Sequence, residues 1–212
     1  MSSRRRILLG SAALLAMPAL ASSRRVLAAM TDGPFYPPRA WRQGWADQDA
    51  DLAHVQRDGR TLVAQGEHLA LDLRVADSAG RIVDGAELEI WQCDALTVYR
   101  HPNAALEPGA FDEGFQGFGA TRSDGTGAAR FISIRPVPYP GRTPHIHIKL
   151  RHASFGELTS QLFVAGDAGN AGDFLWRSLA AADRAALALQ LRPAPAASGL
   201  RWTAQQVLTV PA

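Results

Sequence analysis

Residue types that bind metals or stabilise anions gather in one nine-residue stretch, Tyr139-Pro140-Gly141-Arg142-Thr143-Pro144-His145-Ile146-His147. Residues i and i+2 of an extended strand point to the same face, so both histidines can reach one ion. Another tyrosine, Tyr99, follows an apolar stretch that is typical of a strand running into a loop. Two phenolates and two imidazoles form a hard, anionic donor set that suits a trivalent ion. The pattern therefore favours Fe(III) over zinc, whose sites prefer thiolate, imidazole and carboxylate.

Each of these residues also has an ordinary structural interpretation. The two histidines fit the solvent face of an edge strand, and Tyr139 between two prolines fits a packed turn. Arg142 fits a surface charge, because the chain holds many arginines and Lys149 as its single lysine. Gln161 fits a strand residue that satisfies buried backbone groups. When Tyr99 and Arg142 are considered with the histidines, metal ligation becomes the favoured interpretation.

Alternating hydrophobicity predicts a series of short strands separated by turns rich in Gly and Asp. In the first strand, the side chains Leu69, Leu71, Leu73 and Val75 share one face. The expected strands span residues 67–77, 82–83, 86–92, 128–134, 145–151, 158–164 and 202–210. One or two short helices are expected within residues 173–191, where Leu and Ala recur at helical intervals. The expected fold is mainly β, an antiparallel β-sandwich with short C-terminal helices.

The first 29 residues have the pattern of an export signal. Arg4-Arg5-Arg6 precedes an apolar run that ends near Ala21 and is short for a membrane span, which is typical of a twin-arginine signal peptide. Leu27-Ala28-Ala29 fits a cleavage site, with Ala19-Leu20-Ala21 as the other choice and a retained anchor as the alternative. We therefore expect a signal at 1–29, one folded domain at 30–212, and a periplasmic or secreted protein exported by the twin-arginine machinery.

Charge and cysteine content narrow the function further. Without residues 1–29 the formal charge moves from +2 to −3, because five arginines and no acidic residue are lost. No basic stripe with interleaved aromatic residues remains, so nucleic-acid binding is not expected. Cys93 is the only cysteine, which excludes an intrachain disulfide, and it is expected to be a small buried residue. The proline-rich arm 31–38 is expected to run extended over the surface.

Several separated motifs together resemble the intradiol ring-cleavage dioxygenases, and they occur in the order in which that family has them. They are Asp32-Gly33-Pro34-Phe35-Tyr36, Tyr99-Arg100-His101, Pro138-Tyr139-Pro140, Pro144-His145-Ile146-His147 and Ser160-Gln161-Leu162-Phe163. The resemblance covers residues 31–167, which is most of the chain after the expected signal. Motifs that agree in register over this length are much more specific than a single pattern. The resemblance makes residues 30–212 a catalytic domain with the sandwich of that family.

The resemblance implies a non-haem Fe(III) cofactor held by Tyr99, Tyr139, His145 and His147, with Tyr139 and His145 as the axial pair. It also implies that Tyr139 accepts a proton, that Arg142 lies near the substrate ring and that Gln161 lines the same pocket. The implied reaction uses O2 to cleave a small aromatic diol of the catechol type between its two hydroxyl-bearing carbons, giving a muconate-type diacid. The loop from Tyr139 to His145 is shorter than in the catechol and protocatechuate enzymes, so the substrate stays open.

Two other classes of function remain open for the same residues. One keeps the sandwich as a periplasmic transthyretin-like or immunoglobulin-like binding module, whose His and Tyr residues hold zinc, copper or no metal and catalyse nothing. The other is an interaction domain that presents the arm 32–38 to a partner. A homo-oligomer is compatible with the resemblance, but the chain lacks the long N-terminal helical domain of the catechol-type members, so their dimer interface is not assumed.

Overall fold

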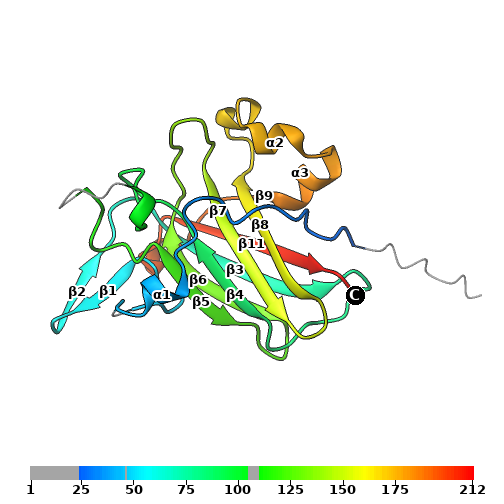
Figure 1. Cartoon of the computed structure of the whole chain (residues 1–212), viewed down its shortest axis with the longest axis horizontal. Coiled ribbons are helices and arrows are strands. Elements are labelled where there is room, and N and C mark those ends of the chain that lie inside the picture. Colours follow the sequence, from blue (N-terminus) through cyan, green and yellow to red (C-terminus); the bar gives the residue numbers. More distant parts are fainter. Residues whose placement is uncertain (1–23, 46, 105–109) are drawn as a thin grey trace, which may run out of the picture.

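The computed structural model describes residues 24–45, 47–104 and 110–212, and two packed β-sheets form its body (Figure 1). The arginine motif and the apolar run of the expected signal lie outside these residues. Within the described part of the chain, no helix is long and apolar enough to cross a membrane. The mainly β sandwich expected from the sequence is confirmed.

One sheet has four strands in the order β10-β11-β3-β6. β3 (His68–Asp77) and β6 (Ala128–Ile134) pair antiparallel, and β10 (Arg192–Pro193) adds a short antiparallel edge to β11 (Trp202–Val210). β11 and β3, however, run parallel along the whole length of β11. Parallel neighbours need a long connection between them, and most of the chain lies between these two strands. The sandwich is therefore not antiparallel throughout, which periodicity alone did not reveal.

The other sheet has five strands in the order β5-β4-β7-β8-β9. Antiparallel pairing joins β5 (Phe118–Arg122), β4 (Glu87–Trp91), β7 (His145–His152) and β8 (Gly156–Val164). β9 (Ala188–Leu189) pairs in parallel with the end of β8. The register places His147 of β7 between Trp91 of β4 and Gln161 of β8. Three strands therefore contribute one row of side chains at this position.

The alternation of β7 divides its side chains between the core and the outer face of the five-stranded sheet. Ile146, Ile148 and Leu150 are fully buried, and they belong to the same hydrophobic cluster as Leu71 and Phe131 of the four-stranded sheet. Burying each such side chain contributes about 1.5–3 kcal/mol. The intervening residues of β7, which include both histidines, consequently point to the outer face. The core thus fixes the direction of the two histidine side chains.

Besides the two-residue strands β9 and β10, three strands were not predicted from the sequence, although two of them carry a recognisable signal. β1 (His54–Arg57) and β2 (Arg60–Val63) form a hairpin whose turn, Asp58-Gly59, has φ values of +50° and +72°. Asp-Gly between two short strands is a strong hairpin signal. β5 contains Gly119, where an added Cβ would come within 2.4 Å of Leu52. A glycine normally weakens a strand and therefore argues against one in the sequence. Here the close approach of Leu52 requires the glycine, so the strand could not be recognised from its residues.

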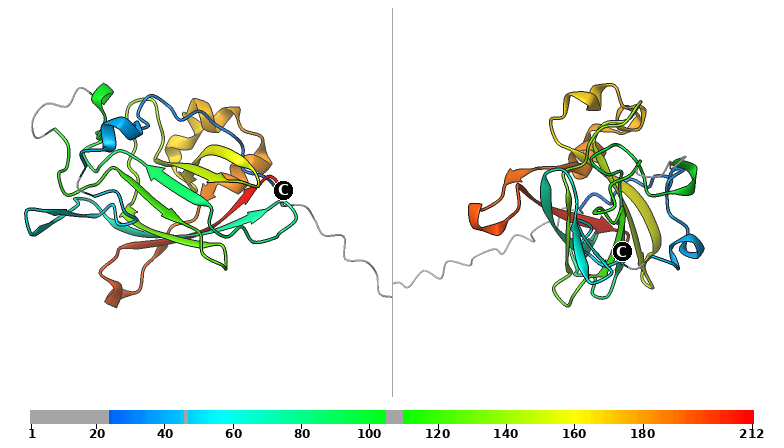
Figure 2. Two further views of the ribbon diagram at one scale, coloured as in Figure 1. Left: turned by 60° about the horizontal axis from the view of Figure 1, so that its bottom comes forward. Right: turned by 90° about the vertical axis from the view of Figure 1, so that its left-hand side faces the viewer.

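Short helices flank the sandwich. α1 (Arg39–Arg42) follows the arm, and α2 (Phe174–Ser178) and α3 (Ala181–Leu187) confirm the helices expected within residues 173–191. Asp173 begins α2, because its carboxylate accepts hydrogen bonds from the N–H groups of Leu175 and Trp176. Three 3-10 turns complete the elements of the described residues: η1 (Pro102–Ala104), η2 (Ala168–Ala171) and η3 (Ala196–Ser198). α2 and α3 lie at the same end of the sandwich as the loop that precedes β7 (Figure 2).

Candidate metal centre

His145 and His147 project from the beginning of β7 onto the outer face of the five-stranded sheet, where both are buried. Their Nε2 atoms lie 3.3 Å apart. The indole ring of Trp91 stacks on the His147 ring, with 4.8 Å between centroids and 14° between planes. Neighbouring strands therefore hold the second imidazole in place, and the two ring nitrogens face one another.

A tight turn brings Tyr139 and Arg142 to the same site. The N–H of Arg142 donates to the carbonyl of Tyr139 at 2.9 Å, and Gly141 has φ +83°. Pro followed by Gly at the centre of a four-residue turn favours this geometry, because proline fixes a negative φ and glycine accepts a positive one. The turn leaves Arg142 Nη1 at 3.4 Å from the Tyr139 hydroxyl. The short loop thus places a phenol and a guanidinium side by side.

Tyr99 reaches the centre from the loop after β4. Asp94 shapes this loop, because its Oδ1 accepts from the N–H groups of Leu96 and Val98, each at 2.9 Å. The Tyr99 side chain is buried, and its hydroxyl lies 3.4 Å from His145 Nε2. Its ring is 5.7 Å from the ring of Tyr139, centroid to centroid. All four residues proposed as ligands from the sequence therefore meet at one place, although they come from three segments.

Burial keeps the two imidazoles neutral. Desolvation, together with the positive charge of nearby Arg142, lowers the pKa of His145 to about 4, although the hydrogen bond to the Thr143 carbonyl opposes the shift. Desolvation and the neighbouring His145 also lower the pKa of His147 well below its usual value. The ring of His145 donates from Nδ1 to the Thr143 carbonyl at 2.6 Å. This hydrogen bond sets the tautomer and leaves the Nε2 lone pair directed at the centre.

Burial has the opposite effect on the two phenols. Desolvation raises the pKa of Tyr99 well above its usual value. Desolvation also raises the pKa of Tyr139, although the positive charge of Arg142 offsets part of that shift. Both hydroxyls are consequently protonated in the metal-free protein at neutral pH. A strongly charged cation is needed to ionise them, so metal binding to these phenols must release protons.

The spacing of the donors fits one ion. Two atoms that each lie roughly 2.1 Å from an ion are separated by roughly 3.0–3.6 Å at angles of 90–120°. The separations of 3.3 Å between the histidine nitrogens and 3.4 Å between Tyr99 and His145 fall in this interval. Among the described residues, no group of three or more His, Cys, Asp and Glu side chains is placed to hold a metal ion. The donors beside the histidines are phenols, which fit a ferric ion better than zinc.

Arg142 is held by a network that the sequence did not reveal. Its Nε donates to Asp173 Oδ2 at 2.8 Å and its Nη2 to Gln161 Oε1 at 2.6 Å. The side chain of Asp173 is fully buried and that of Arg142 is 9% exposed. The same carboxylate also accepts from the N–H of Thr143. Asp173 therefore connects the turn, the guanidinium and the start of α2. In the sequence, the only feature that distinguishes Asp173 is its position as a possible helix cap.

The arm crosses the outer face of β7 and β8, as the blue segment in Figure 1 shows. It has no regular strand, as expected for 31–38. The ring of Phe35 stacks on Tyr99 with 4.6 Å between centroids and turns its edge to Tyr139 at 6.4 Å. Gly33 lies so close to His147 that an added Cβ would be 3.4 Å from its Cε1 atom. The arm consequently forms one wall of the centre.

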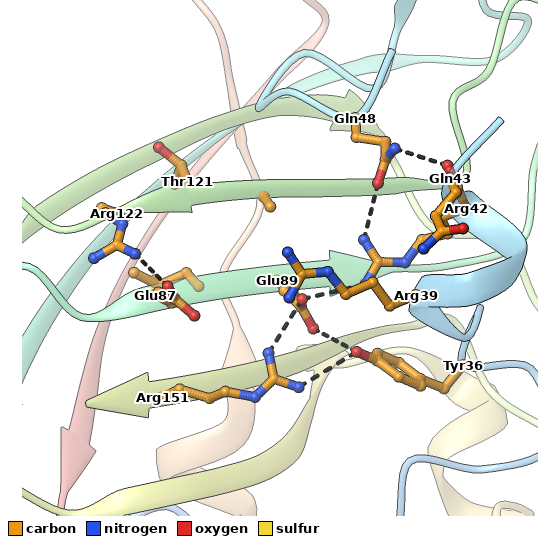
Figure 3. Close-up of a pocket in the computed structure, with 12 residues that line it drawn as sticks. Tyr36, Arg39, Arg42, Gln43, Gln48, Glu87, Glu89, Thr121, Arg122 and Arg151 are labelled. Atoms are coloured by element: carbon orange, nitrogen blue, oxygen red, sulfur yellow. Dashed lines mark hydrogen bonds and ion pairs between the residues drawn. The ribbon is translucent and has the colours of Figure 1, made fainter. Parts of the chain in front are cut away.

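A large cavity lies elsewhere on this face of the sheet. It encloses about 880 Å³ between α1 and strands β4, β5 and β7, and none of the four donors lines it. Ion pairs fill much of it: Glu89 pairs with Arg42 and Arg151, and Glu87 pairs with Arg122 (Figure 3). The size of this hollow is therefore no guide to the chemistry of the protein.

Cys93 and two further histidines lie outside the set of donors. Cys93 is buried as expected, and desolvation raises the pKa of its thiol to about 12, so it stays a thiol. His101 is also buried, but its Nε2 lies 3.1 Å from the carbonyl of Tyr36 and its Nδ1 accepts from the N–H of Asn103. His152 lies at the far end of β7 and contacts Ser154. None of these three residues contributes a donor to the centre.

Similarity to known proteins extends over most of the described chain. A family model for dioxygenases matches residues 31–205. The protocatechuate 3,4-dioxygenase beta chain of Burkholderia cepacia is 33% identical over 128 residues, which are 56% of this chain and 53% of that protein. Hydroxyquinol 1,2-dioxygenase of Corynebacterium glutamicum is 30% identical over 122 residues, 49% of this chain and 38% of that protein.

Among solved structures, 3-chlorocatechol 1,2-dioxygenase of Rhodococcus opacus 1CP is similar with a TM-score of 0.66 at 21% sequence identity. The similarity covers 90% of this chain and 74% of that structure. At this identity it establishes the shared fold. The chain spans about half or less of the length of the two curated relatives.

Proposed function

Because this chain belongs to the intradiol ring-cleavage dioxygenase family, we propose that it is an Fe(III)-dependent enzyme that uses O2 to cleave a catechol-type diol between its two hydroxyl-bearing carbons. The product is a muconate-type diacid, which contains all atoms of the diol and both atoms of O2. The observation that supports this proposal best is the convergence of two phenols and two imidazoles on one point. The four proposed ligands are Tyr99, Tyr139, His145 and His147.

Iron, when bound, supplies electron withdrawal from the bound diol, which activates the ring towards O2. The protein residues hold the reactants and move protons. A catechol must lose two protons to bind through both oxygens. Tyr139 is half-buried, whereas Tyr99 and both histidines are buried, so Tyr139 is the donor that an entering diol meets. With iron bound, the Tyr139 phenolate would accept one of the two protons, and hydroxide from solvent would accept the other.

Arg142 stabilises the negative charge that this proton transfer and ring activation create. Its guanidinium is fixed by Asp173 and Gln161 and lies against the Tyr139 hydroxyl. A fixed positive group in a mostly buried site stabilises developing anionic charge without reorganisation of the protein. Gln161 contributes by holding the Nη2 edge of the guanidinium, and through β8 it stands beside His147.

The substrate class follows from the family relatives and from the wall of the centre. The two curated relatives are named for protocatechuate and hydroxyquinol, and both compounds carry hydroxyl groups on adjacent ring carbons. Phe35 and Tyr99 form an aromatic stack beside the donors, which suits a flat ring. Catechol, protocatechuate and hydroxyquinol are therefore the first compounds to test.

We propose also that the protein is exported by the twin-arginine route and acts in the periplasm or outside the cell. The support for this proposal is Arg4-Arg5-Arg6 followed by a short apolar run. Because that route carries folded proteins, the centre can be assembled before export. Fusion of residues 1–35 to a reporter that is exported only when folded tests the proposal, with Arg5→Lys/Arg6→Lys as the control that must block export.

The decisive experiment for the reaction is an anaerobic spectral titration of the iron-loaded protein, followed by exposure to ¹⁸O₂. Tyrosinate bound to Fe(III) gives a red-brown charge-transfer colour, and the band is expected to change when a substrate diol is added. One O2 should then be consumed per diol, and the diacid should carry both labelled atoms. A colourless protein that binds zinc or copper, or no metal, would instead support a binding module without catalysis.

A further inference from the structure

Lys149 is an unusual residue, because it is the only lysine of the chain and its side chain is just 4% exposed. Buried charges persist where they are paired and hydrogen-bonded. Its Nζ lies 2.6 Å from Asp32 Oδ2, and Glu157 is a more distant partner at 3.5 Å. Lys149 stands two residues after His147 on β7, so it points to the same outer face as the proposed ligands.

The carboxylate of Asp32 joins two strands to the arm. Its second oxygen, Oδ1, accepts from Thr159 Oγ1 at 2.7 Å, and Thr159 is the β8 partner of Lys149 in register. Four residues further along, Tyr36 forms a second anchor. Its hydroxyl donates to Glu89 Oε2 at 2.8 Å and accepts from Arg151 Nη2 at 3.3 Å (Figure 3). The arm is therefore fastened to the sheet on both sides of residues 33–35.

The fastened segment is the part of the arm that touches the metal centre. A Cβ added at Gly33 would lie in contact with His147 Cε1, at 3.4 Å, and the φ of Gly33 is +75°, which favours glycine. Phe35 stacks on Tyr99 at 4.6 Å. The Lys149 Nζ also lies 4.0 Å from the centroid of the Tyr36 ring, so one ammonium group contacts both anchors. Loss of that group would release the wall of the centre and would leave the proposed ligands themselves in place.

We propose that Asp32 and Lys149 are positioning residues that clamp the N-terminal arm against the metal centre and so fix the wall that confines the substrate ring. The effect on catalysis rests on the proposed function, whereas the clamping of the arm does not. The sequence places Asp32 in a motif shared with the family but gives no hint of its partner, which lies more than a hundred residues further along the chain.

Lys149→Met tests the clamp, because methionine keeps the apolar stem and removes the ammonium group. The carboxylate of Asp32 is 37% exposed and can be hydrated, so the variant is expected to fold. In the metal-free protein, chymotrypsin should cut after Phe35 at least tenfold faster than in the wild type. In the iron-loaded protein, KM for the diol should rise at least tenfold, whereas iron content, the visible band and kcat should change less than threefold.

Two further variants make the test specific. Asp32→Asn removes the other charge of the clamp from a partly exposed position and should reproduce both changes even if Lys149→Met fails to fold. Glu87→Gln is the matched control, because Glu87 lies on the same sheet and pairs with Arg122 rather than with the arm in the described structure, and it should leave proteolysis and KM unchanged. If Lys149→Met or Asp32→Asn kept the proteolysis rate and the KM of the wild type, the proposed clamp would be wrong. Absence of iron from the wild type would instead contradict the proposed function. The proteolysis of the metal-free variants would still show whether Asp32 and Lys149 hold the arm in place.

A separate observation concerns the segment just before the arm. Leu27 is 3% exposed within the main hydrophobic cluster, and its N–H donates to the carbonyl of Thr209 in β11 at 2.9 Å. The N–H of Met30 donates to the carbonyl of Thr159 in β8 at 2.8 Å. The carbonyl of Ala28 accepts from Ser160 Oγ at 2.7 Å. Because β11 and β8 belong to different sheets, this segment bridges the two layers of the sandwich.

From these contacts we infer that export processing leaves residues 24–29 on the mature protein and that cleavage follows Ala21. Cleavage after Ala29 would remove Leu27 from the core and break its bond to β11. Ala19-Leu20-Ala21 is the other small-residue pattern that fits a signal peptidase, and it precedes the packed segment. The inference rests on the proposed export and is independent of the metal centre.

Intact-mass measurement of the exported protein tests this assignment, and the expected mature chain begins at Ser22. Ala21→Leu should block processing, whereas Ala29→Leu, at an exposed position, should be processed like the wild type. A mature chain that begins at Met30, or one that keeps its whole leader, would overturn the assignment. Failure of export itself would show as precursor in the cytoplasm, which distinguishes it from cleavage at another position.

Discussion

Replacing Asp173 with asparagine isolates the charge that holds Arg142 in the metal centre. The Asp173 carboxylate is fully buried and accepts from Arg142 Nε at 2.8 Å and from the N–H of Thr143 at 3.0 Å. Burial opposes its ionisation, but the N–H groups at the start of α2 and the Arg142 guanidinium lower its pKa below the usual value. Asparagine keeps the shape of the side chain and removes this charge.

The expected loss of stability follows from the interactions that asparagine at position 173 can still make. Removing one partner of a buried ion pair costs about 3–5 kcal/mol, because the other charge stays buried without compensation. Asparagine retains one accepting oxygen, so the free energy of unfolding should fall by about 2–4 kcal/mol. The guanidinium is also released from its position beside the Tyr139 hydroxyl. We therefore expect kcat to fall about 100-fold in a protein that still binds iron.

Urea unfolding of the metal-free protein and steady-state kinetics of the iron-loaded protein measure the two effects. Asp167→Asn is the matched control, because Asp167 caps η2 by accepting from the N–H of Gly169 at 2.8 Å and carries no ion pair to Arg142 in the described structure. The control should lose no more than ~1 kcal/mol. Equal losses in the two variants, or a wild-type kcat in Asp173→Asn, would refute the assigned role.

Three further predictions concern the centre itself. Tyr99→Phe and His147→Ala should each lose iron or its red-brown colour, as elemental analysis and visible spectra will show, and full activity in either variant would disprove the ligand assignment. Arg142→Lys keeps a positive charge but cannot bridge Asp173, Gln161 and Tyr139 together, so kcat should fall about 100-fold with iron content unchanged. The metal-free protein should lose stability as the pH falls from about 6.5 to about 4, because burial lowers the pKa of His145 to about 4 and the unfolded chain binds the proton first. The loss should approach roughly 3 kcal/mol, and a flat urea midpoint across this range would contradict it.

Much of the sandwich could be predicted because its strands have clear local patterns. β6 and β11 begin and end where the sequence indicated, and β3 and β7 differ from the expected ranges by one residue. Each carries alternating apolar residues bounded by Gly, Asp or Pro, and that signal depends only on neighbours in the chain. The parallel pairing of β11 with β3 could not be predicted in this way, because pairing depends on distant parts of the chain.

The proposed donors were predictable, and the residues that hold them were not. His145 and His147 share a face by strand geometry, and Tyr139 and Arg142 meet through a turn that Pro140-Gly141 favours. Asp173 and Lys149 act through contacts with residues far away in sequence, and an isolated aspartate or lysine has no distinguishing local pattern. Their roles depend on burial and pairing, which only the folded chain reveals.

The central claim is that two phenols and two imidazoles hold one ferric ion, and metal analysis combined with visible spectroscopy tests it most directly. Purified protein reconstituted with iron should contain one iron per chain and show a tyrosinate charge-transfer band. That band should shift on anaerobic addition of a catechol and disappear in Tyr99→Phe/Tyr139→Phe. A wild-type protein without stoichiometric iron, or a band that survives removal of both tyrosines, would contradict the account.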